Sequence, residues 1–108
     1  MTVTSQVGFV DMPLGPALQK ALSDIGYVQP TPIQEAFIPL ALESTDIIGQ
    51  AQTGTGKTAA FLLPILSKIT EQRHPQALIL GPTRELVQQV ADEALRLRGE
   101  MDVRISAV

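Results

Sequence analysis

An eight-residue stretch of this sequence has the residue types and order of a loop that binds phosphate groups. Residues 51–58 read Ala-Gln-Thr-Gly-Thr-Gly-Lys-Thr, which fits the pattern Gly-x-x-x-x-Gly-Lys-[Ser/Thr] everywhere except at its first position. Glycines let the backbone wrap tightly, so that successive N–H groups point at phosphate oxygens. Lys57 would place an ammonium against the β- and γ-phosphates of a nucleotide, and the Thr58 hydroxyl would bind its Mg²⁺. The stretch therefore predicts a site for a nucleotide with Mg²⁺, in which Lys57 and Thr58 are the catalytic side chains. The other contacts are expected from Gln52, Thr53, Gly54, Thr55 and Gly56.

The residues on either side of this loop are of the types that such a loop requires. Residues 46–50 are typical of a short buried strand leading in, and residues 59–63 of a helix leading out. A helix that begins near Lys57 adds the positive end of its dipole to the phosphate site. The alternative is a chance turn, rich in Gly and Thr, that happens to contain a lysine, and it explains neither flank. The alanine at the pattern's first position matters little, because the tightest turns fall at Gly54 and Gly56.

A second candidate side chain, Gln34, lies upstream of the loop and has two possible roles. Thr31 suits a helix N-cap and Pro32 the first helical position, so Gln34 would complete a capping box three residues after the cap. Alternatively, its carboxamide accepts a hydrogen bond from the N6 amino group of adenine and donates one to N7, a pairing that guanine refuses. The spacing alone favours neither role, and the two are compatible because the cap would fix the origin of the side chain.

Hydrophobic periodicity and helix breakers predict the elements that position these side chains. The expected helices cover residues 13–25, 31–42, 57–69 and 83–98. The expected strands cover residues 46–50, 77–80 and 102–108. Gly26 and Gly99 should stop the first and last helices, and Pro64 should kink the third. Strands that alternate with helices predict an α/β fold, with a parallel sheet flanked by helices. Because the last strand coincides with the end of the sequence, we expect this sheet to be truncated.

The bulk properties narrow the class of protein. The chain has 108 residues, 44% apolar content, a net charge of −3 and no cysteine. This length indicates one domain at most, and the lack of cysteine excludes disulfides and thiolate zinc sites. No segment has the pattern of a signal peptide or a membrane span, so a cytoplasmic protein is expected. The acidic charge indicates that any contact with nucleic acid depends on a few placed residues.

Three blocks of residues, taken together and in this order, resemble a known protein family. They are residues 26–34 (Gly-Tyr-Val-Gln-Pro-Thr-Pro-Ile-Gln), the phosphate loop at 51–58, and residues 82–89 (Pro-Thr-Arg-Glu-Leu-Val-Gln-Gln). They resemble the Q motif, motif I and motif Ia of DEAD-box RNA helicases. Phe9, which lies 17 positions before Gly26 (26 − 9 = 17), matches that family's isolated upstream aromatic. The resemblance covers nearly the whole chain and implies that residues 1–108 are the N-terminal portion of a first RecA-like domain, of the P-loop NTPase class.

The resemblance also implies roles for individual side chains. It favours adenine recognition by Gln34, stacking of Phe9 on the adenine ring, and support of the adenine pocket by Tyr27. The alternatives are that Phe9 is a core residue under the first helix and that Tyr27 simply packs at the helix stop. At the start of the last helix, the resemblance implies contacts to RNA phosphates; the alternatives there are an ordinary N-cap and a solvated arginine. The residues in question are Pro82, Thr83 and Arg84.

Residues 92–95, Asp-Glu-Ala-Leu, come close to the four-residue signature that names the family, but we do not assign them to it. The family's signature follows a strand further along the chain, where its acids reach Mg²⁺ and the attacking water. Here helical periodicity runs through the two acids, which indicates a solvated acidic face of the last helix.

The sequence therefore predicts the ATP-binding part of an ATP-dependent RNA helicase. Hydrolysis also needs a carboxylate for Mg²⁺, a group that orients water, and further cations. The resemblance assigns these to the DEAD motif and a second RecA-like domain, so the 108 residues alone are expected to hydrolyse nothing. The alternative is a non-enzymatic nucleotide-binding or interaction module, and a small-molecule kinase ranks last because it leaves residues 26–34 and 82–89 unexplained. An incomplete sheet further predicts self-association of the chain.

Overall fold

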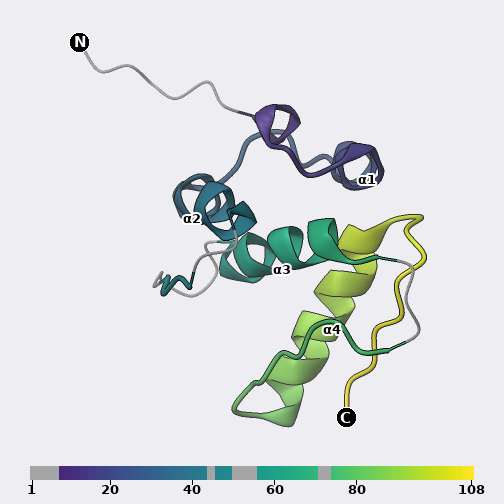
Figure 1. Cartoon of the computed structure of the whole chain (residues 1–108). Coiled ribbons are helices and arrows are strands. Elements are labelled where there is room, and N and C mark those ends of the chain that lie inside the picture. Colours follow the sequence, from purple (N-terminus) through teal and green to yellow (C-terminus); the bar gives the residue numbers. More distant parts are fainter. Residues whose placement is uncertain (1–7, 44–45, 50–55, 71–73) are drawn as a thin grey trace.

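The fold is an arrangement of helices joined by extended loops, as seen in a computed structural model that describes residues 8–43, 46–49, 56–70 and 74–108. A single 3₁₀ turn, η1, covers Phe9–Asp11, and the first two α-helices are α1 (Pro16–Asp24) and α2 (Pro32–Leu42). They are followed by α3 (Lys57–Lys68) and α4 (Arg84–Arg98), as Figure 1 shows. None of the helices in these ranges is long and apolar enough to cross a membrane.

The start of α2 confirms the predicted capping box. The Thr31 hydroxyl accepts a hydrogen bond from the Gln34 N–H at 3.4 Å, and the Gln34 Oε1 accepts one from the Thr31 N–H at 2.8 Å. Pro32 occupies the first turn, where a missing N–H has no cost. These reciprocal bonds satisfy two donors that a helix start otherwise leaves open. The same bonds fix the place from which the Gln34 side chain projects.

The first helix begins later than its predicted start at residue 13. Gly15, with φ +94°, is the N-cap of α1, so the helix itself begins at Pro16. Phe9–Asp11 forms the separate turn η1. The Gln19 carboxamide joins the two elements, because its Nε2 donates to the carbonyls of Phe9 at 2.8 Å and Met12 at 2.7 Å. A side chain from α1 thus gives hydrogen bonds to carbonyl groups of η1 and of the segment that follows it. Hydrophobic periodicity does not predict such a contact, which is why the start of α1 was placed too early.

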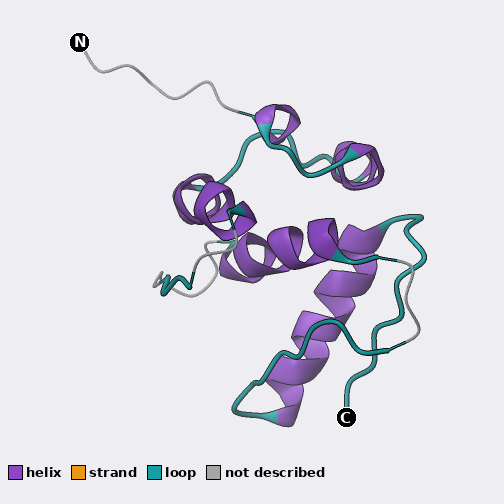
Figure 2. Ribbon diagram, viewed as in Figure 1, coloured by secondary structure: helices purple, strands orange, loops and turns teal. Residues whose placement is uncertain are grey.

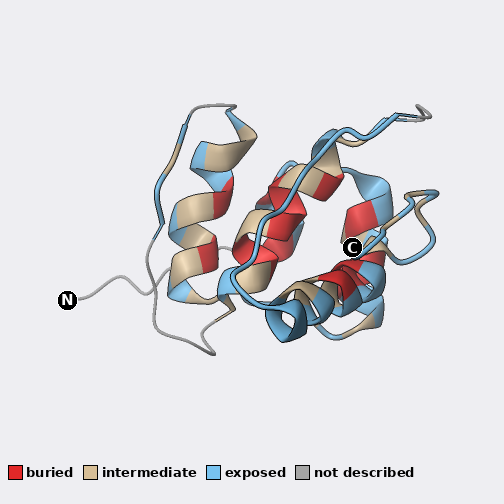
Figure 3. Cartoon of the chain, turned by 90° about the horizontal axis from the view of Figure 1, so that it is seen from below, coloured by how far each residue is buried: buried red, intermediate tan, exposed pale blue. Residues whose placement is uncertain are grey.

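The core lies around α3, which packs against both α2 and α4 (Figure 3). Its apolar side chains are buried on two faces of the helix, whereas α1 and α4 each contribute one buried stripe. Pro64 lies inside α3 and is itself buried. The largest fully buried side chains are Phe9, Leu18, Leu22, Ile38, Leu62, Leu63 and Leu97.

The predicted parallel sheet is not confirmed, because the described residues contain no strand (Figure 2). Residues 46–49, 77–80 and 102–108 all run as loops, and residue 50 lies outside the described residues. Ile48 is 92% exposed, Leu78 83% and Leu80 85%, so their apolar side chains face solvent. A strand exists only where a neighbour satisfies its backbone, and none of these three segments lies in a ladder within the described part of the chain.

The terminal segment shows which interactions replace a ladder there. The Arg98 Nη1 donates to the Val103 carbonyl at 3.0 Å and to the Met101 carbonyl at 3.5 Å. The Val103 N–H donates to the Met101 carbonyl at 3.0 Å. Val103 and Ile105 are partly buried against the core. Local bonds from the end of α4 therefore hold this segment without a partner strand.

Candidate functional site

The centre of the candidate site is the start of α3, where the chain leaves the phosphate loop. Gly56 is the N-cap of this helix and has φ +81°, a left-handed conformation that favours glycine. Lys57 and Thr58 follow in the first turn, where backbone N–H groups have no partner within the helix. This arrangement is the one that anions favour at helix N-termini. The remaining predicted contacts, Gln52, Thr53, Gly54 and Thr55, lie outside the described residues.

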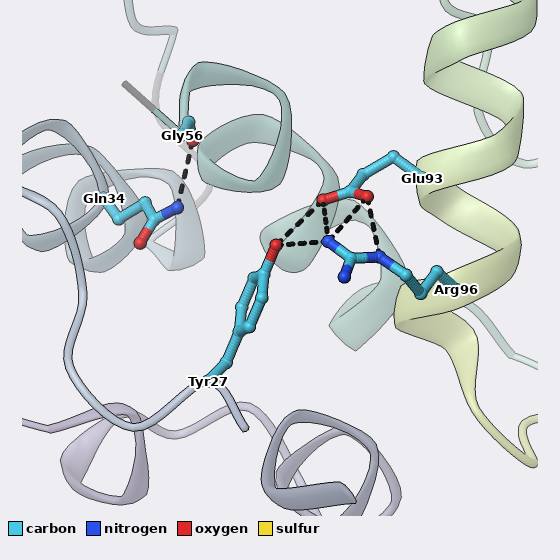
Figure 4. A network of polar contacts seen from close by, with 5 residues as sticks. All are labelled: Tyr27, Gln34, Gly56, Glu93 and Arg96. Atoms are coloured by element: carbon cyan, nitrogen blue, oxygen red, sulfur yellow. Dashed lines mark hydrogen bonds and ion pairs between the residues drawn. The ribbon is translucent and has the colours of Figure 1, made fainter. Parts of the chain in front are cut away.

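Gln34 joins α2 to this helix start. Its Nε2 donates to the Gly56 carbonyl at 3.1 Å (Figure 4). Its Oε1 accepts from the Thr31 N–H at 2.8 Å. The side chain is only 3% exposed and is the buried polar residue of the described core. A carboxamide has two donors and two acceptor lone pairs, so one of each remains for a further partner. The capping role of Gln34 is confirmed. Its contact with adenine stays a prediction, for which the carboxamide still has one donor and one acceptor lone pair.

The packing between Gly56 and α2 is tight. A Cβ added to Gly56 would lie 2.4 Å from Gln34 Nε2 and 3.0 Å from Thr31 Oγ1. Thr31 Oγ1 belongs to the capping box, and Gln34 Nε2 donates to the Gly56 carbonyl, so hydrogen bonds hold both atoms in place. The site thus requires glycine twice, once for the positive φ and once for the close approach of α2.

A small pocket opens beside Lys57, with a volume of about 130 Å³. Among the described residues that line it, Lys57 carries the one charge and the others are apolar. Phosphates need several hydrogen-bond donors, so these described residues alone do not make a phosphate site. The described lining residues of the pocket are Ile33, Phe37, Ile47, Gly49, Lys57, Ala60 and Phe61.

Phe9 and Tyr27 form an aromatic pair. Their ring centroids are 6.0 Å apart with an interplanar angle of 27°. Phe9 is only 2% exposed and belongs to the core, which is the placement that the core alternative predicts. The Phe9 N–H donates to the Val28 carbonyl at 3.0 Å, which ties η1 to residues 26–34. Stacking of Phe9 on adenine stays a prediction, and it requires that one face of the ring becomes uncovered.

Tyr27 also contacts α4, through a network that sequence reasoning missed. Its hydroxyl donates to Glu93 Oε2 at 3.2 Å and accepts a bond from Arg96 Nη2 (Figure 4). The Arg96 guanidinium lies 5.1 Å from the centroid of the Tyr27 ring. The Glu93 carboxylate accepts hydrogen bonds from this guanidinium and raises the pKa of Arg96 above its ordinary value. The spacing of Glu93 and Arg96 on one helix was visible in the sequence. Nothing in the sequence indicated that Tyr27, 66 residues before Glu93, would bind to this pair.

The start of α4 holds the residues predicted to contact RNA. Thr83 is the N-cap, and its hydroxyl accepts from the Leu86 N–H at 3.2 Å. Pro82 and Arg84 are exposed. The cap role is confirmed, and contact with RNA phosphates stays a prediction for this exposed helix end.

The two acids of the Asp-Glu-Ala-Leu stretch lie in the middle of α4, as predicted. Asp92 is exposed and accepts a bond from Gln88 one turn earlier, at 2.9 Å. Glu93 differs, because its side chain is 22% exposed and takes part in the Tyr27 network. The prediction of a solvated acidic face therefore holds for Asp92, whereas Glu93 lies partly inside the contact between α4 and Tyr27.

Comparison with known proteins identifies the family of this chain. The model of the DEAD/DEAH box helicase family matches residues 31–108. These residues include the capping box, the helix start at Gly56 and the start of α4. The chain belongs to the DEAD/DEAH box helicase family.

Curated relatives and solved structures agree with this assignment. The chain is 50% identical over 101 residues to the ATP-dependent RNA helicase CshA of Limosilactobacillus reuteri, which covers 93% of this chain and 20% of that protein. It is 50% identical over 91 residues to the ATP-dependent RNA helicase DeaD of Haemophilus influenzae, which covers 83% of this chain and 15% of that protein. The chain thus spans about a fifth or less of the length of these relatives.

Two solved structures resemble the fold. One is a DEAD box protein from the hyperthermophile Methanococcus jannaschii, with a TM-score of 0.84 and 40% identity over 89% of this chain and 27% of that one. The other is the RNA helicase Prp28 from Chaetomium thermophilum bound to ADP, with a TM-score of 0.70 and 54% identity over 75% of this chain and 21% of that one. The arrangement of the described helices is therefore that of DEAD-box proteins, although the described residues contain no strand.

Proposed function

We propose that this chain is the N-terminal part of the first RecA-like domain of an ATP-dependent RNA helicase, and that it supplies that enzyme's adenine and phosphate contacts. The observation that carries the proposal is the hydrogen bond from Gln34 to the Gly56 carbonyl. It connects the side chain expected to recognise a purine directly to the helix start expected to hold phosphates. The names of the curated relatives and the family match support the same function.

The described residues fit a nucleotide with Mg²⁺. Gly56 is the N-cap of α3, and the N–H groups at the start of this helix favour the negative charge of phosphates. Lys57 is exposed at the first position of that helix, so its ammonium is available to the phosphates, and the Thr58 hydroxyl would bind Mg²⁺. When bound, the Mg²⁺ would neutralise charge that develops on the phosphates during transfer. The chain's own residues hold and orient the nucleotide.

RNA is the proposed macromolecular partner, bound at the start of α4. Thr83 already caps this helix, so its remaining N–H groups and the exposed Arg84 would meet phosphate oxygens beside Pro82. The acidic net charge of −3 suits recognition by a few placed groups better than a broad electrostatic surface.

Turnover of ATP tests the proposal. We expect the longer protein that contains these residues to hydrolyse ATP in an RNA-dependent manner and GTP far less well, in an assay of phosphate release. The 108-residue chain alone should release no phosphate, because hydrolysis also needs acids and cations from other segments. A longer protein that binds ATP without RNA-stimulated turnover would instead favour a non-enzymatic nucleotide-binding module. RNA-stimulated turnover by the 108 residues alone would contradict the assignment of catalytic groups to other segments.

Self-association of the 108-residue chain is a further expectation. The exposed apolar side chains of Ile48, Leu78 and Leu80 lie on segments whose backbone has no ladder in the described residues. Such segments favour pairing with a second chain. Sedimentation velocity should show a weight-average mass that rises with concentration. Replacement of both Leu78 and Leu80 by Lys should shift the distribution towards monomer, whereas a monomer at all concentrations for the unaltered chain would contradict the expectation.

A further inference from the structure

Tyr27 connects three parts of the chain that lie far apart in sequence. Its ring stacks on Phe9 of η1 on one side, and the Arg96 guanidinium lies over the ring at 5.1 Å from the centroid. Its backbone N–H donates to the Leu22 carbonyl at 2.8 Å, at the end of α1. Tyr27 is therefore fixed at its backbone, its ring and its hydroxyl, as Figure 4 shows for the hydroxyl.

The two residues that hold the hydroxyl form one unit on α4. Arg96 Nε donates to Glu93 Oε1 at 3.0 Å, and Arg96 Nη2 donates to Glu93 Oε2, also at 3.0 Å. This two-pronged pair presents both an acceptor and a donor to the phenol oxygen. The Glu93 side chain is 22% exposed and that of Arg96 47%, so the pair lies at the edge of the contact between α4 and Tyr27. An exposed Glu–Arg pair alone contributes little to stability. The Glu93–Arg96 pair differs from such a pair because it also bonds to the Tyr27 hydroxyl.

The position of Tyr27 affects the proposed purine site, four residues before the N-cap Thr31. The backbone of Thr31 is bonded to Gln34, and Gln34 is bonded to Gly56. A shift of Tyr27 would therefore move the chain that leads into the capping box, together with the Phe9–Tyr27 pair. Lys57 and Thr58 belong to the first turn of α3, so the backbone of that helix holds them when Tyr27 shifts. The purine side of the site thus has a support on α4 in addition to the bond that joins it to Gly56.

We infer that Glu93 and Arg96 are positioning residues, which hold Tyr27 and thereby orient residues 26–34 and Phe9 for the purine of the nucleotide. This inference rests on the proposed function. It assigns a role to a face of α4 that is distinct from the RNA contacts expected at the N-terminus of that helix. It also separates Glu93 from its neighbour Asp92, which accepts a bond from Gln88 on the exposed face of α4.

Steady-state kinetics of the longer protein tests the inference, with Tyr27→Phe and Glu93→Ala as the variants and Asp92→Ala as the matched control. Tyr27→Phe keeps both ring contacts and removes only the hydroxyl. We expect each of the two variants to raise the KM for ATP roughly fivefold, the effect of one ordinary hydrogen bond, with kcat unchanged. Inhibition by Mg²⁺-tripolyphosphate, which has no purine, should be unchanged. Asp92→Ala should behave as the unaltered protein, and the double variant Tyr27→Phe/Glu93→Ala should be no worse than either single variant.

The outcomes separate this inference from the proposed function. An unaltered protein without RNA-stimulated ATP turnover overturns both. An active protein in which Tyr27→Phe leaves the KM for ATP unchanged overturns the inference alone. A merely structural network would weaken ATP and tripolyphosphate alike, and that result also counts against the inference. If Glu93→Ala fails to fold, Tyr27→Phe decides.

A spectroscopic readout is independent of activity. Tyr27 is the only tyrosine of the 108 residues, so its ring signals in a proton–carbon NMR spectrum need no assignment by mutation. In the 108-residue chain, we expect these tyrosine signals to shift when Glu93 is replaced by alanine. They should stay in place when Asp92 is replaced by alanine. Identical spectra in all three proteins would show that the network does not hold Tyr27 in solution, which overturns the inference.

Discussion

Replacement of Gly56 by alanine is expected to destabilise the chain by about 2–5 kcal/mol and to abolish detectable nucleotide binding. Two costs add. A left-handed φ of +81° costs an L-residue about 1–2 kcal/mol, and forcing a methyl into a packed contact costs roughly 1–3 kcal/mol more. The methyl would lie 2.4 Å from Gln34 Nε2, so the carboxamide that links α2 to α3 must move. Denaturant unfolding followed by circular dichroism measures the first effect, and calorimetric titration with ATP and Mg²⁺ on the longer protein measures the second.

Gly26 provides a matched control for this substitution. It has the same φ of +81°, but a Cβ added there meets nothing within 4 Å. Gly26→Ala should therefore show the conformational cost of about 1–2 kcal/mol alone. The difference between the two variants isolates the contact between Gly56 and Gln34. Equal destabilisation by both would mean that the close approach of α2 to the phosphate loop has no energetic weight.

Helices were predictable from the sequence because their start signals are local. Thr31, Pro32 and Gln34 lie within one turn of each other, and their hydrogen bonds form wherever that turn forms. The same holds for Thr83, whose side chain caps α4 from three residues away. These signals placed the first residue of α2 and of α4 as the structure has them.

Strands were not predictable in the same way, because their stability depends on partners. Residues 77–80 are apolar enough for a buried strand, yet they remain exposed loop in this structure. The composition of a segment indicates how much apolar surface it would bury in a sheet. It does not indicate whether neighbouring strands are present to pair with it. The phosphate loop could be predicted for the opposite reason, since its glycines and Lys57 have expected roles at fixed spacing, and it stays a prediction.

Two features of the site depend on contacts that cross the sequence. The bond from Gln34 to the Gly56 carbonyl spans 22 residues, and that from Tyr27 to Glu93 spans 66. Neither partner carries a local signal for the other. The burial of Phe9 against Tyr27 belongs to the same class, because the family resemblance implied an adenine role for each ring but not that the two rings would stack on each other.

Replacement of Gln34 by glutamate should separate its two roles. A carboxylate still accepts from the Thr31 N–H, as in an ordinary capping box, so α2 keeps its start. It cannot donate, so it loses the bond to the Gly56 carbonyl and the predicted bond to adenine N7. We expect the preference of the longer protein for ATP over GTP to fall roughly ten- to hundredfold, the weight of a bidentate contact to a base. The ratio of kcat/KM for the two nucleotides measures it.

The leucine variant completes the comparison. Gln34→Leu has a similar volume but leaves the Thr31 N–H without its side-chain acceptor, which should cost about 1–3 kcal/mol of unfolding free energy. The Gly56 carbonyl keeps the bond that it accepts from the Ala60 N–H at 3.1 Å, so α3 should remain intact. If Gln34 served only as a cap, leucine would lower stability while glutamate would leave nucleotide preference unchanged. If Gln34 also recognises the purine, both variants lose the preference for ATP and only leucine loses the cap, because purine recognition needs the amide and the cap needs only an oxygen.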